Sequence, residues 1–409
     1  MCQGTVGDDK MTQIFQTRKS LVGDVELQQK GVQLNIAPKK DDRFTDFLEN
    51  MSQQILAVTY WFEPNVQADP YPVTIRFSGH RVDVQGRLLA GDRFVQDETI
   101  ENVIPESGPI SVTARVSGIN PGKWVVTAQL QGMTPSTRKS KSRKQGHVPP
   151  TGIPIQSSMR LWHKWAPIAG STEPISTCLL PFVRVPGILP GAWGILALLG
   201  ILVALIFQTL VIAQKHLLLG SVGTVSLVSI SVGIISAKTW YVVSYRRERL
   251  IAGWCIQGFI TGAILTATIL LVLLKVPVGT FLDVTVPGLL IAMAVGRVGC
   301  FFAGCCGGRP TASHWGVWAS DQRVGVRRTP TQLLELTLAL VLGVTTLLVV
   351  LSHGPANGAV FVVGLAAYTL VRQGILSLRT EPRKTTWGGS ITAAFSAIIL
   401  IVAVFFLLR

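Results

Sequence analysis

The fold of this chain is decided by Ile195-Leu-Ala-Leu-Leu-Gly-Ile-Leu-Val-Ala-Leu-Ile-Phe207 and the apolar residues around it. No charged side chain interrupts residues 191–213, and about 20 apolar residues in a helix are enough to cross the hydrocarbon core of a membrane. Six further apolar stretches of similar length follow. The sequence therefore predicts seven transmembrane helices, at about 191–213, 221–245, 254–274, 280–303, 333–353, 357–377 and 387–408.

Charge divides the 409 residues into two parts. Residues 186–409 carry 16 basic and 5 acidic side chains, whereas residues 1–185 carry 21 and 17. So few carboxylates are typical of a membrane domain. The charged fraction of the whole chain is 14%, against about 25% in soluble proteins. The composition argues against a soluble enzyme along the whole length, and a hydrophobic fraction of 48% argues against disorder.

The part before the helices is expected to hold an all-β sandwich. Short segments alternate apolar and polar side chains, as half-buried strands do, and turns rich in Gly, Pro and Asn separate them. The stretch 118–128 resembles the end of an immunoglobulin-like or fibronectin-like domain. The predicted strands are Ile55–Phe62, Val73–Phe77, Val82–Val84, Ile110–Val116 and Trp124–Ala128.

These patterns predict four segments in a multi-domain chain. A flexible arm covers 1–54, with a helix near Phe44–Ile55, and the sandwich covers 55–132. A basic linker and membrane approach covers 133–186, and the all-α, seven-span domain covers 187–409. Five basic groups within 138–144 favour anionic lipid headgroups or a solvated linker. Nucleic acid is not expected, because no aromatic residues are interleaved to stack bases.

Four ionisable residues fall within or at the ends of the apolar segments, where a charge is expensive and usually marks function. They are Lys238, Asp283, Arg297 and Arg372. Snorkelling from a helix end is the alternative for Lys238 and Asp283. Arg297 fits that alternative poorly, because helical residues precede it. Five glycines lie within 296–308, four of them between Arg297 and Arg309, and glycine amides flanked by arginines are suited to binding a phosphate.

Three cysteines in the same loop have three interpretations. Cys300, Cys305 and Cys306 could bind a metal, but the C-x4-CC spacing has no partnered histidine nearby, so no metal is expected. Arginine neighbours could make one of the thiols reactive. Small apolar packing residues are the simplest interpretation.

Several motifs, in order over about 190–405, resemble the bacterial prolipoprotein diacylglyceryl transferase family. The family has a Gly-Arg-x-Gly-Asn-Phe loop ending in Gly-Glu-x-x-Gly-Arg, then Arg-x-Pro-Thr-Gln-Leu-Tyr-Glu, then Tyr-x-x-x-Arg with a second arginine. The matching segments are Gly296–Phe301, Gly304–Arg309, Arg328–Glu335, and Tyr368 with Arg372 and Arg379.

The resemblance implies a bacterial plasma-membrane enzyme without a cofactor. Such an enzyme moves a diacylglyceryl group from phosphatidylglycerol to the lipobox cysteine thiol of a prolipoprotein and leaves glycerol phosphate. Arg297 and Arg372 take the places of the essential arginines, because a displaced phosphate needs positive charge in a water-poor site. Expected partners are phosphatidylglycerol, the prolipoprotein signal-peptide region, membrane lipids and an unknown ligand of the sandwich. The substrate-binding residues are expected to be Trp193, Gln257, Gly299, Cys300, Gly304, Cys305, Gly308, Arg309, Arg328 and Arg379.

The chain departs from the family at several polar positions. Gln257 replaces a histidine, and glutamine cannot act as a general base. These losses are compatible with an altered acceptor, or with a non-catalytic lipid-binding relative whose sandwich recruits a partner. A small-solute transporter is a weaker alternative, because no paired Gly/Pro-broken spans are evident. The other replacements are Trp193 for tyrosine, Cys300 for asparagine, Cys305 for glutamate, Leu334 for tyrosine and Leu376 for glutamate.

The orientation in the membrane has two conflicting indications. Ten basic residues lie in loops on the N-terminal side of the spans and three on the opposite side, which by the positive-inside rule places the sandwich in the cytoplasm. The family instead has its N-terminus and its arginine-bearing loops outside. We expect the family orientation for the site and leave the sandwich unplaced.

Overall fold

The computed structural model describes residues 2–3, 54–64, 69–82, 91–131, 152–156, 174–179, 183, 185–215, 219–244, 254–355, 357–380 and 387–408. The chain forms two compact units. One comprises Met1–Asn50 with Ile212–Phe281, and the other comprises Met51–Val211 with Leu282–Arg409. Each unit is described by itself.

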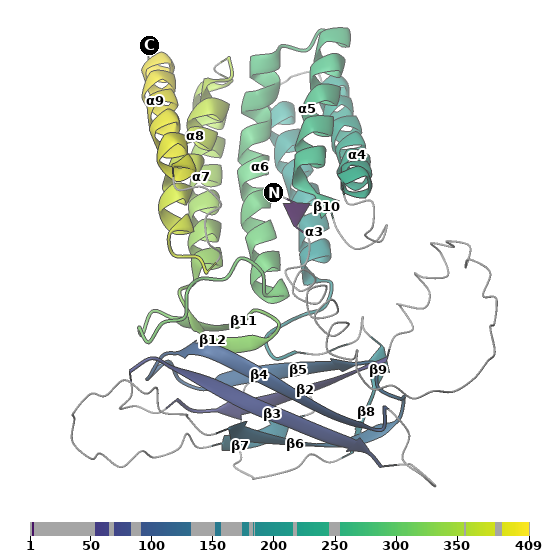
Figure 1. Cartoon of the computed structure of the whole chain (residues 1–409). Helices are drawn as coiled ribbons and strands as arrows, with labels where there is room; N and C mark the ends of the chain where they lie inside the picture. The colour runs from purple at the N-terminus through teal and green to yellow at the C-terminus, as the bar shows by residue number, and fades with distance from the viewer. Residues whose placement is uncertain are drawn as a thin grey trace, which may run out of the picture. The chain divides into compact units, whose positions relative to one another are not determined.

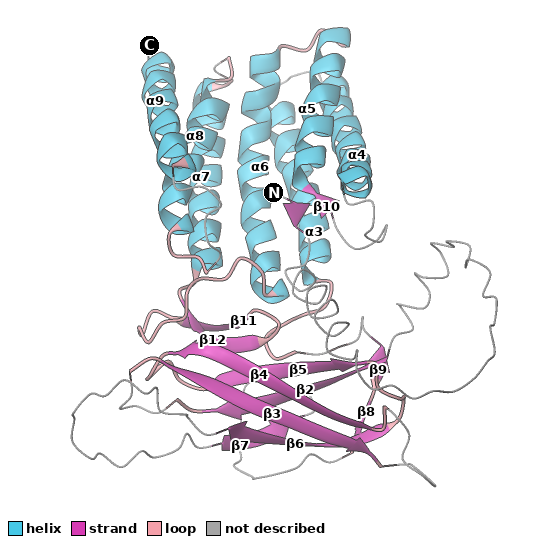
Figure 2. Cartoon of the chain, viewed as in Figure 1, coloured by secondary structure: helices cyan, strands magenta, loops and turns pink. Residues whose placement is uncertain are grey.

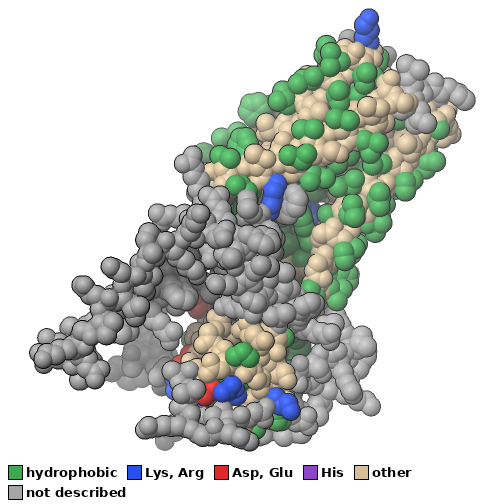
Figure 3. All heavy atoms as spheres, turned by 90° about the vertical axis from the view of Figure 1, so that its right-hand side faces the viewer, with side chains coloured by type: hydrophobic (Ala, Val, Ile, Leu, Met, Phe, Trp, Pro, Cys, Tyr) green, Lys and Arg blue, Asp and Glu red, His purple; other side chains and the backbone are tan. Residues whose placement is uncertain are grey.

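Seven of the described helices are long and apolar enough to span a membrane. They confirm the all-α part of the predicted fold (Figures 1 and 2). Many exposed side chains on these helices are large and hydrophobic, and hydrophobic atoms gather over them in Figure 3. The helices are α3 (Ala192–Gln214), α4 (Leu219–Ser244), α5 (Ile256–Leu273), α6 (Val278–Ala303), α7 (Thr331–His353), α8 (Ala359–Leu376) and α9 (Gly388–Leu408).

Glycines allow the helices of the second unit to approach closely. A Cβ on Gly288 of α6 would lie 2.5 Å from the carbonyl oxygen of Ala204 on α3, and one on Gly343 of α7 would lie 2.8 Å from Cγ1 of Ile291 on α6. Small residues at such contacts are typical of helices packed in a membrane. The buried carboxylate of Asp283 accepts hydrogen bonds of 2.9 Å from the backbone N–H groups of Gly358 and Phe361, at the start of α8. Asp283 is therefore a helix cap and does not snorkel.

Two antiparallel sheets form the β part, which confirms the predicted sandwich. One sheet has the order β4-β3-β6-β8. The other contains β2, β5, β7 and β9. Apolar side chains from both sheets form one core, which includes the fully buried Phe77 and Trp124. The strands are β2 (Gln54–Phe62), β3 (Tyr71–Arg81), β4 (Arg93–Val103), β5 (Ile110–Ser117), β6 (Lys123–Gln131), β7 (Gly152–Gln156), β8 (Ile175–Ser176) and β9 (Cys178–Leu179).

A hairpin from the loop between α6 and α7 completes the second sheet. It consists of β11 (Val317–Ser320) and β12 (Val324–Arg328), and the sheet order is β11-β12-β5-β2-β7. β12 pairs with β5, and Val326 joins the sandwich core. Trp318 of β11 stacks on Trp61 of β2 with ring centroids 5.3 Å apart. A loop that the sequence assigns to the membrane domain is thus part of the sandwich.

The strands extend beyond the predicted sandwich. β7, β8 and β9 lie within 133–186, the segment predicted as a linker, and pair with strands of the sandwich. β4 is a strand that the predicted set omits, and of the predicted strand Val82–Val84 only Val82 lies within the described residues. In the predicted arm, β1 (Cys2–Gln3) pairs with β10 (Trp254–Cys255). The predicted helix near 44–55 and the basic run 138–144 lie outside the described residues, except for Gln54 and Ile55, which are in β2.

Candidate functional site

Three arginines converge on one carboxylate in the second unit. Glu335 is fully buried and lies 2.6 Å from Nη2 of Arg297 and 2.5 Å from Nη2 of Arg379. Nε of Arg372 lies 3.8 Å from the same carboxylate. Three arginines and one glutamate therefore lie together in a largely buried cluster, and they carry an excess of two positive charges. Such an excess in a desolvated place favours an anionic ligand.

Each charged group of this cluster comes from a different part of the fold. Arg297 lies one and a half turns before the end of α6, and Glu335 lies in the second turn of α7. Arg372 lies one turn before the end of α8, and Arg379 follows that helix. Arg372 is the most accessible of the three arginines of the cluster, with 35% of its side chain exposed, against 14% for Arg297 and 8% for Arg379. It is therefore the group of the cluster best placed to reach a ligand.

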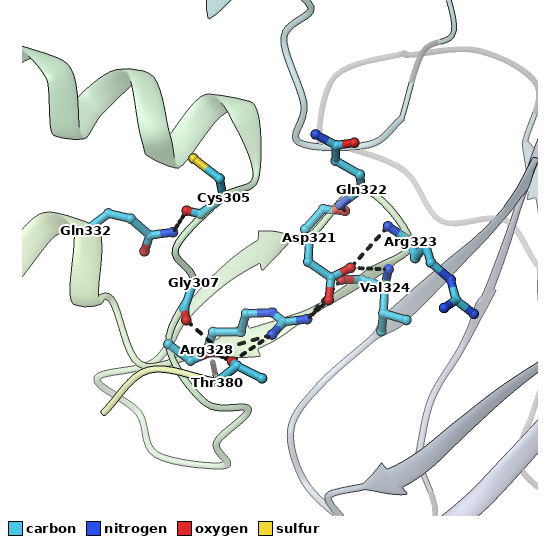
Figure 4. Close-up of polar contacts among 11 residues, drawn as sticks. Cys305, Gly307, Asp321, Gln322, Arg323, Val324, Arg328, Gln332 and Thr380 are labelled. Atoms are coloured by element: carbon cyan, nitrogen blue, oxygen red, sulfur yellow. Dashed lines mark hydrogen bonds and ion pairs between the residues drawn. The ribbon is translucent and has the colours of Figure 1, made fainter. Parts of the chain in front are cut away.

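A fourth arginine holds the loops around this cluster. The buried Arg328, at the end of β12, donates to the carboxylate of Asp321 at 2.7 Å and to the carbonyl oxygen of Gly308 at 3.5 Å. It also contacts Oγ1 of Thr380 at 3.5 Å. Figure 4 shows Arg328 between Asp321 and Thr380. One guanidinium group thus ties the hairpin to the glycine loop and to the segment after α8.

The glycines of the loop are required by close backbone contacts. Gly304 has a φ of +70°, and a Cβ there would lie 2.6 Å from the carbonyl oxygen of Ser320. A Cβ on Gly308 would lie 2.0 Å from the carbonyl oxygen of Thr329. Short antiparallel bridges join Gly308 to Arg379 and Pro310 to Arg328. A side chain at position 304 or 308 would collide with the backbone, so the loop needs glycine at both positions to adopt this shape.

The three cysteines of the loop lie together beside the arginines. Their Sγ atoms all lie within 4.8 Å of one another. Cys305 and Cys306 follow the end of α6. Hydrogen bonds from the thiols of Cys300 and Cys305 lower the pKa of Cys306, and Arg379 and Arg297 add to this effect. The pKa of Cys305 is raised, mainly by its hydrogen bonds with the other two thiols. Cys306 is accordingly the thiol of this pair that loses its proton first.

The structure brings together some of the predicted site residues and not others. Arg297, Arg372, Arg379 and Arg328 lie in or next to the cluster, as described above. Arg309 is exposed and donates from Nε to the carbonyl oxygen of Arg379 at 3.2 Å. Trp193 lies on α3, where its Cα would be 3.3 Å from a Cβ on Gly299 of α6, and 38% of Trp193 is exposed.

One predicted residue belongs to the other unit, and one important residue is absent from the predicted set. Gln257 is exposed in the first turn of α5, within the unit that contains Ile212–Phe281. Glu335 ends the motif Arg328–Glu335, but the motif alone predicts no role for it. Its signal in the sequence is that residues 186–409 hold only five acidic side chains, so an acid beside an apolar helix stands out.

Comparisons with known proteins point to one family. A sequence model described as prolipoprotein diacylglyceryl transferase matches residues 183–409. Three relatives carry the name phosphatidylglycerol–prolipoprotein diacylglyceryl transferase. One from Dehalococcoides mccartyi is 33% identical over 170 residues, which is 39% of this chain and 65% of the relative. One from Frankia alni is 27% identical over 235 residues (53% and 62%), and one from Clostridium tetani is 26% identical over 225 residues (52% and 90%). The chain spans slightly less than two thirds of the first two relatives.

Proposed function

Because the chain belongs to the prolipoprotein diacylglyceryl transferase family, we propose that it moves a diacylglyceryl group from phosphatidylglycerol to the lipobox cysteine thiol of a prolipoprotein. The observation that carries this proposal is the cluster of Arg297, Arg372 and Arg379 around the buried carboxylate of Glu335. Its excess positive charge lies near the ends of apolar helices, which is suited to the phosphate of a lipid headgroup.

The reaction requires an anion to leave from an apolar surrounding. The acceptor sulfur forms a bond to the terminal glyceryl carbon, and that carbon's bond to a phosphate oxygen breaks. Glycerol phosphate leaves with the electron pair. Positive charge at the phosphate stabilises the charge that develops on this oxygen. Gln257, in place of the family histidine, has no basic nitrogen, so we assign the thiol proton to an oxygen of the departing phosphate.

We assign different roles to Arg372 and Arg297 because their side chains differ in exposure. Arg372 is the most accessible and is assigned the direct contact with the phosphate. Arg297 is more buried and pairs with Glu335, so it supplies charge from a fixed position. Because the carboxylate holds the guanidinium groups before the lipid arrives, little reorganisation is needed during the reaction.

The seven apolar helices and the bacterial origin of the relatives support a bacterial plasma membrane as the location. The replacements at Gln257, Cys300 and Cys305 change no charged group of the arginine cluster, so the proposed phosphate contacts do not depend on them. The acceptor is the part of the reaction that most needs a direct test.

A transfer assay tests the proposal. Purified protein in phosphatidylglycerol vesicles is mixed with a lipobox-containing prolipoprotein, and mass spectrometry measures the added diacylglyceryl group. We expect transfer by the wild-type chain and a rate about 100-fold lower in Arg297→Ala and in Arg372→Ala, as for removal of one oxyanion donor.

The matched control is Arg76→Ala. Arg76 lies in an exposed ion pair with Asp97 on the sandwich, so its removal should leave the transfer rate unchanged. Wild-type rates in both arginine variants of the cluster would refute the assigned site. Absence of transfer alongside an active family member, with phosphatidylglycerol still bound, would favour the lipid-binding alternative.

A further inference from the structure

The three clustered thiols are not explained by phosphate binding. Cys300 lies in the last turn of α6, and Cys305 and Cys306 lie in the loop that follows. All three are free cysteines. Their sulfur atoms form a group in which every pair lies within 4.8 Å. The phosphate contacts proposed above use arginines, so the sulfur atoms are available for a separate role.

The backbone is built to bring these sulfurs together. The N–H of Cys305 donates to the carbonyl oxygen of Cys300 at 3.1 Å, which turns the chain back on the helix end. Cys306 has a φ of +57°, a left-handed conformation that a residue other than glycine adopts at a cost of about 1 kcal/mol or more. Side chains at the start of α7 fix the turn, because Gln332 donates to the carbonyl oxygen of Cys305 at 3.0 Å and Thr331 to that of Cys306 at 3.2 Å. Figure 4 shows the contact between Gln332 and Cys305.

The charge around the thiols favours an anionic group. Arg297 lies one helical turn before Cys300, and both Arg297 and Arg379 act electrostatically on Cys306. Glu335 balances only part of the positive charge of the cluster. A metal bound by three thiolates carries a net negative charge, and the neighbouring guanidinium groups would stabilise it.

We propose that Cys300, Cys305 and Cys306 form a site for one soft metal ion with a filled d shell, Zn²⁺ or Cu⁺. Metal–sulfur bonds of about 2.3 Å place three sulfur atoms about 3.8 to 4.0 Å apart. The three Sγ atoms already lie within 4.8 Å of one another, so side-chain movements of about 1 Å or less would bring them to the spacing that a metal requires. Soft sulfur ligands select such ions over Mg²⁺ or Ca²⁺. A partnered histidine is not needed, because three protein ligands form a complete open site.

The site is tested by metal binding without any lipid or acceptor. The full chain is purified in detergent with a phosphine reductant and stripped of metal. It is then offered Zn²⁺ or Cu⁺ from a competing chelator, and the bound metal is counted by mass spectrometry after desalting. We expect one ion per chain for at least one of the two metals. Less than about one tenth of an ion per chain for both metals would overturn the proposal.

Single-cysteine variants assign the ligands. Cys306→Ser and Cys305→Ser should each weaken the affinity by at least about 10-fold, the smallest effect seen on removing even an outer partner of a metal ligand. Cys178→Ser is the matched control and should bind as the wild type, because Cys178 is a free cysteine of β9 in the sandwich. Wild-type affinity in both Cys305→Ser and Cys306→Ser would also overturn the proposal.

The experiment separates loss of a metal ligand from unfolding, and it separates the metal site from the transferase proposal. Serine is close in size to cysteine, and Cys305 is only half-buried, so at least that variant should retain its fold, as its thermal unfolding will show. The measurement does not use the transfer reaction. Failure to bind metal therefore says nothing against the transferase proposal, and loss of transfer in Arg297→Ala says nothing against the metal site.

Discussion

Glu335 is the residue on which the arginine cluster depends. It is the common partner of Arg297, Arg372 and Arg379, and it is fully buried. Removing one partner of a buried ion pair leaves uncompensated charge and costs about 3 to 5 kcal/mol. We therefore expect Glu335→Gln, which keeps the shape of the side chain, to lower the stability of the protein by about that amount. Thermal unfolding in detergent, followed by the helical signal, measures the loss.

The matched control for Glu335→Gln is an acid in an exposed ion pair. Asp97 pairs with Arg76 at 2.7 Å on the surface of the sandwich, and exposed pairs contribute little to stability. Asp97→Asn should unfold at nearly the wild-type temperature. Equal unfolding temperatures for Glu335→Gln and the wild type would contradict the view that the carboxylate holds the three arginines together.

At the scale of single residues, the sequence indicates which basic side chains matter but not how they are arranged in space. Arg297 and Arg372 stood out because a charge inside an apolar stretch is costly, and both lie at the cluster. The role of Glu335 was not evident, because the spacing of motifs along the chain does not show which of several acids is buried. Asp321 and Glu335 flank the same segment, yet Asp321 is half exposed and Glu335 is not.

At the scale of elements, the hairpin of β11 and β12 depends on a glycine. A Cβ on Gly325 would lie 2.3 Å from Cζ2 of Trp318 and 2.4 Å from Oγ of Ser111 on β5. We expect Gly325→Ala to force β12 away from β5 and to cost about 1 to 3 kcal/mol, as overpacking does. The control is Gly223→Ala on α4, where a Cβ meets nothing within 4 Å. Limited proteolysis of residues 317–328 distinguishes them, and equal cleavage of both variants would contradict the proposed packing.

Helices were easier to predict than strands. The predicted spans end within a few residues of the observed helices, because long uncharged stretches have few alternatives. β12 was not predicted, since Val-Gly-Val-Arg-Arg is short and lies in a basic loop that looks like a ligand site. Its partner β5 lies about 200 residues earlier. β4 was missed because its alternating side chains are largely exposed and polar.

At the scale of the whole molecule, the sandwich is more than an appended domain. Its second sheet includes β12, and Arg328 at the end of that strand holds the glycine loop and the segment after α8. The ion pair between Arg323 and Glu98 of β4 and the hydrogen bond of 3.1 Å from Trp318 to the carbonyl oxygen of Pro109 add to the same connection. The sequence suggests two independent domains, but a hairpin from the loop between α6 and α7 forms part of a sheet of the sandwich. The sandwich is thus in a position to support the arginine cluster.

This support predicts that a change inside the sandwich affects the loops of the site. Trp61 is buried and stacks on Trp318, so Trp61→Leu should weaken the attachment of the hairpin. We expect faster amide hydrogen exchange at 317–328 under native conditions and slower diacylglyceryl transfer, because Arg328 would no longer be fixed. Trp240→Leu, at an exposed tryptophan of α4, should change neither. Unchanged exchange at 317–328 in Trp61→Leu would mean that the hairpin holds its shape without the sandwich, and the β domain would then need a different role, such as binding a partner.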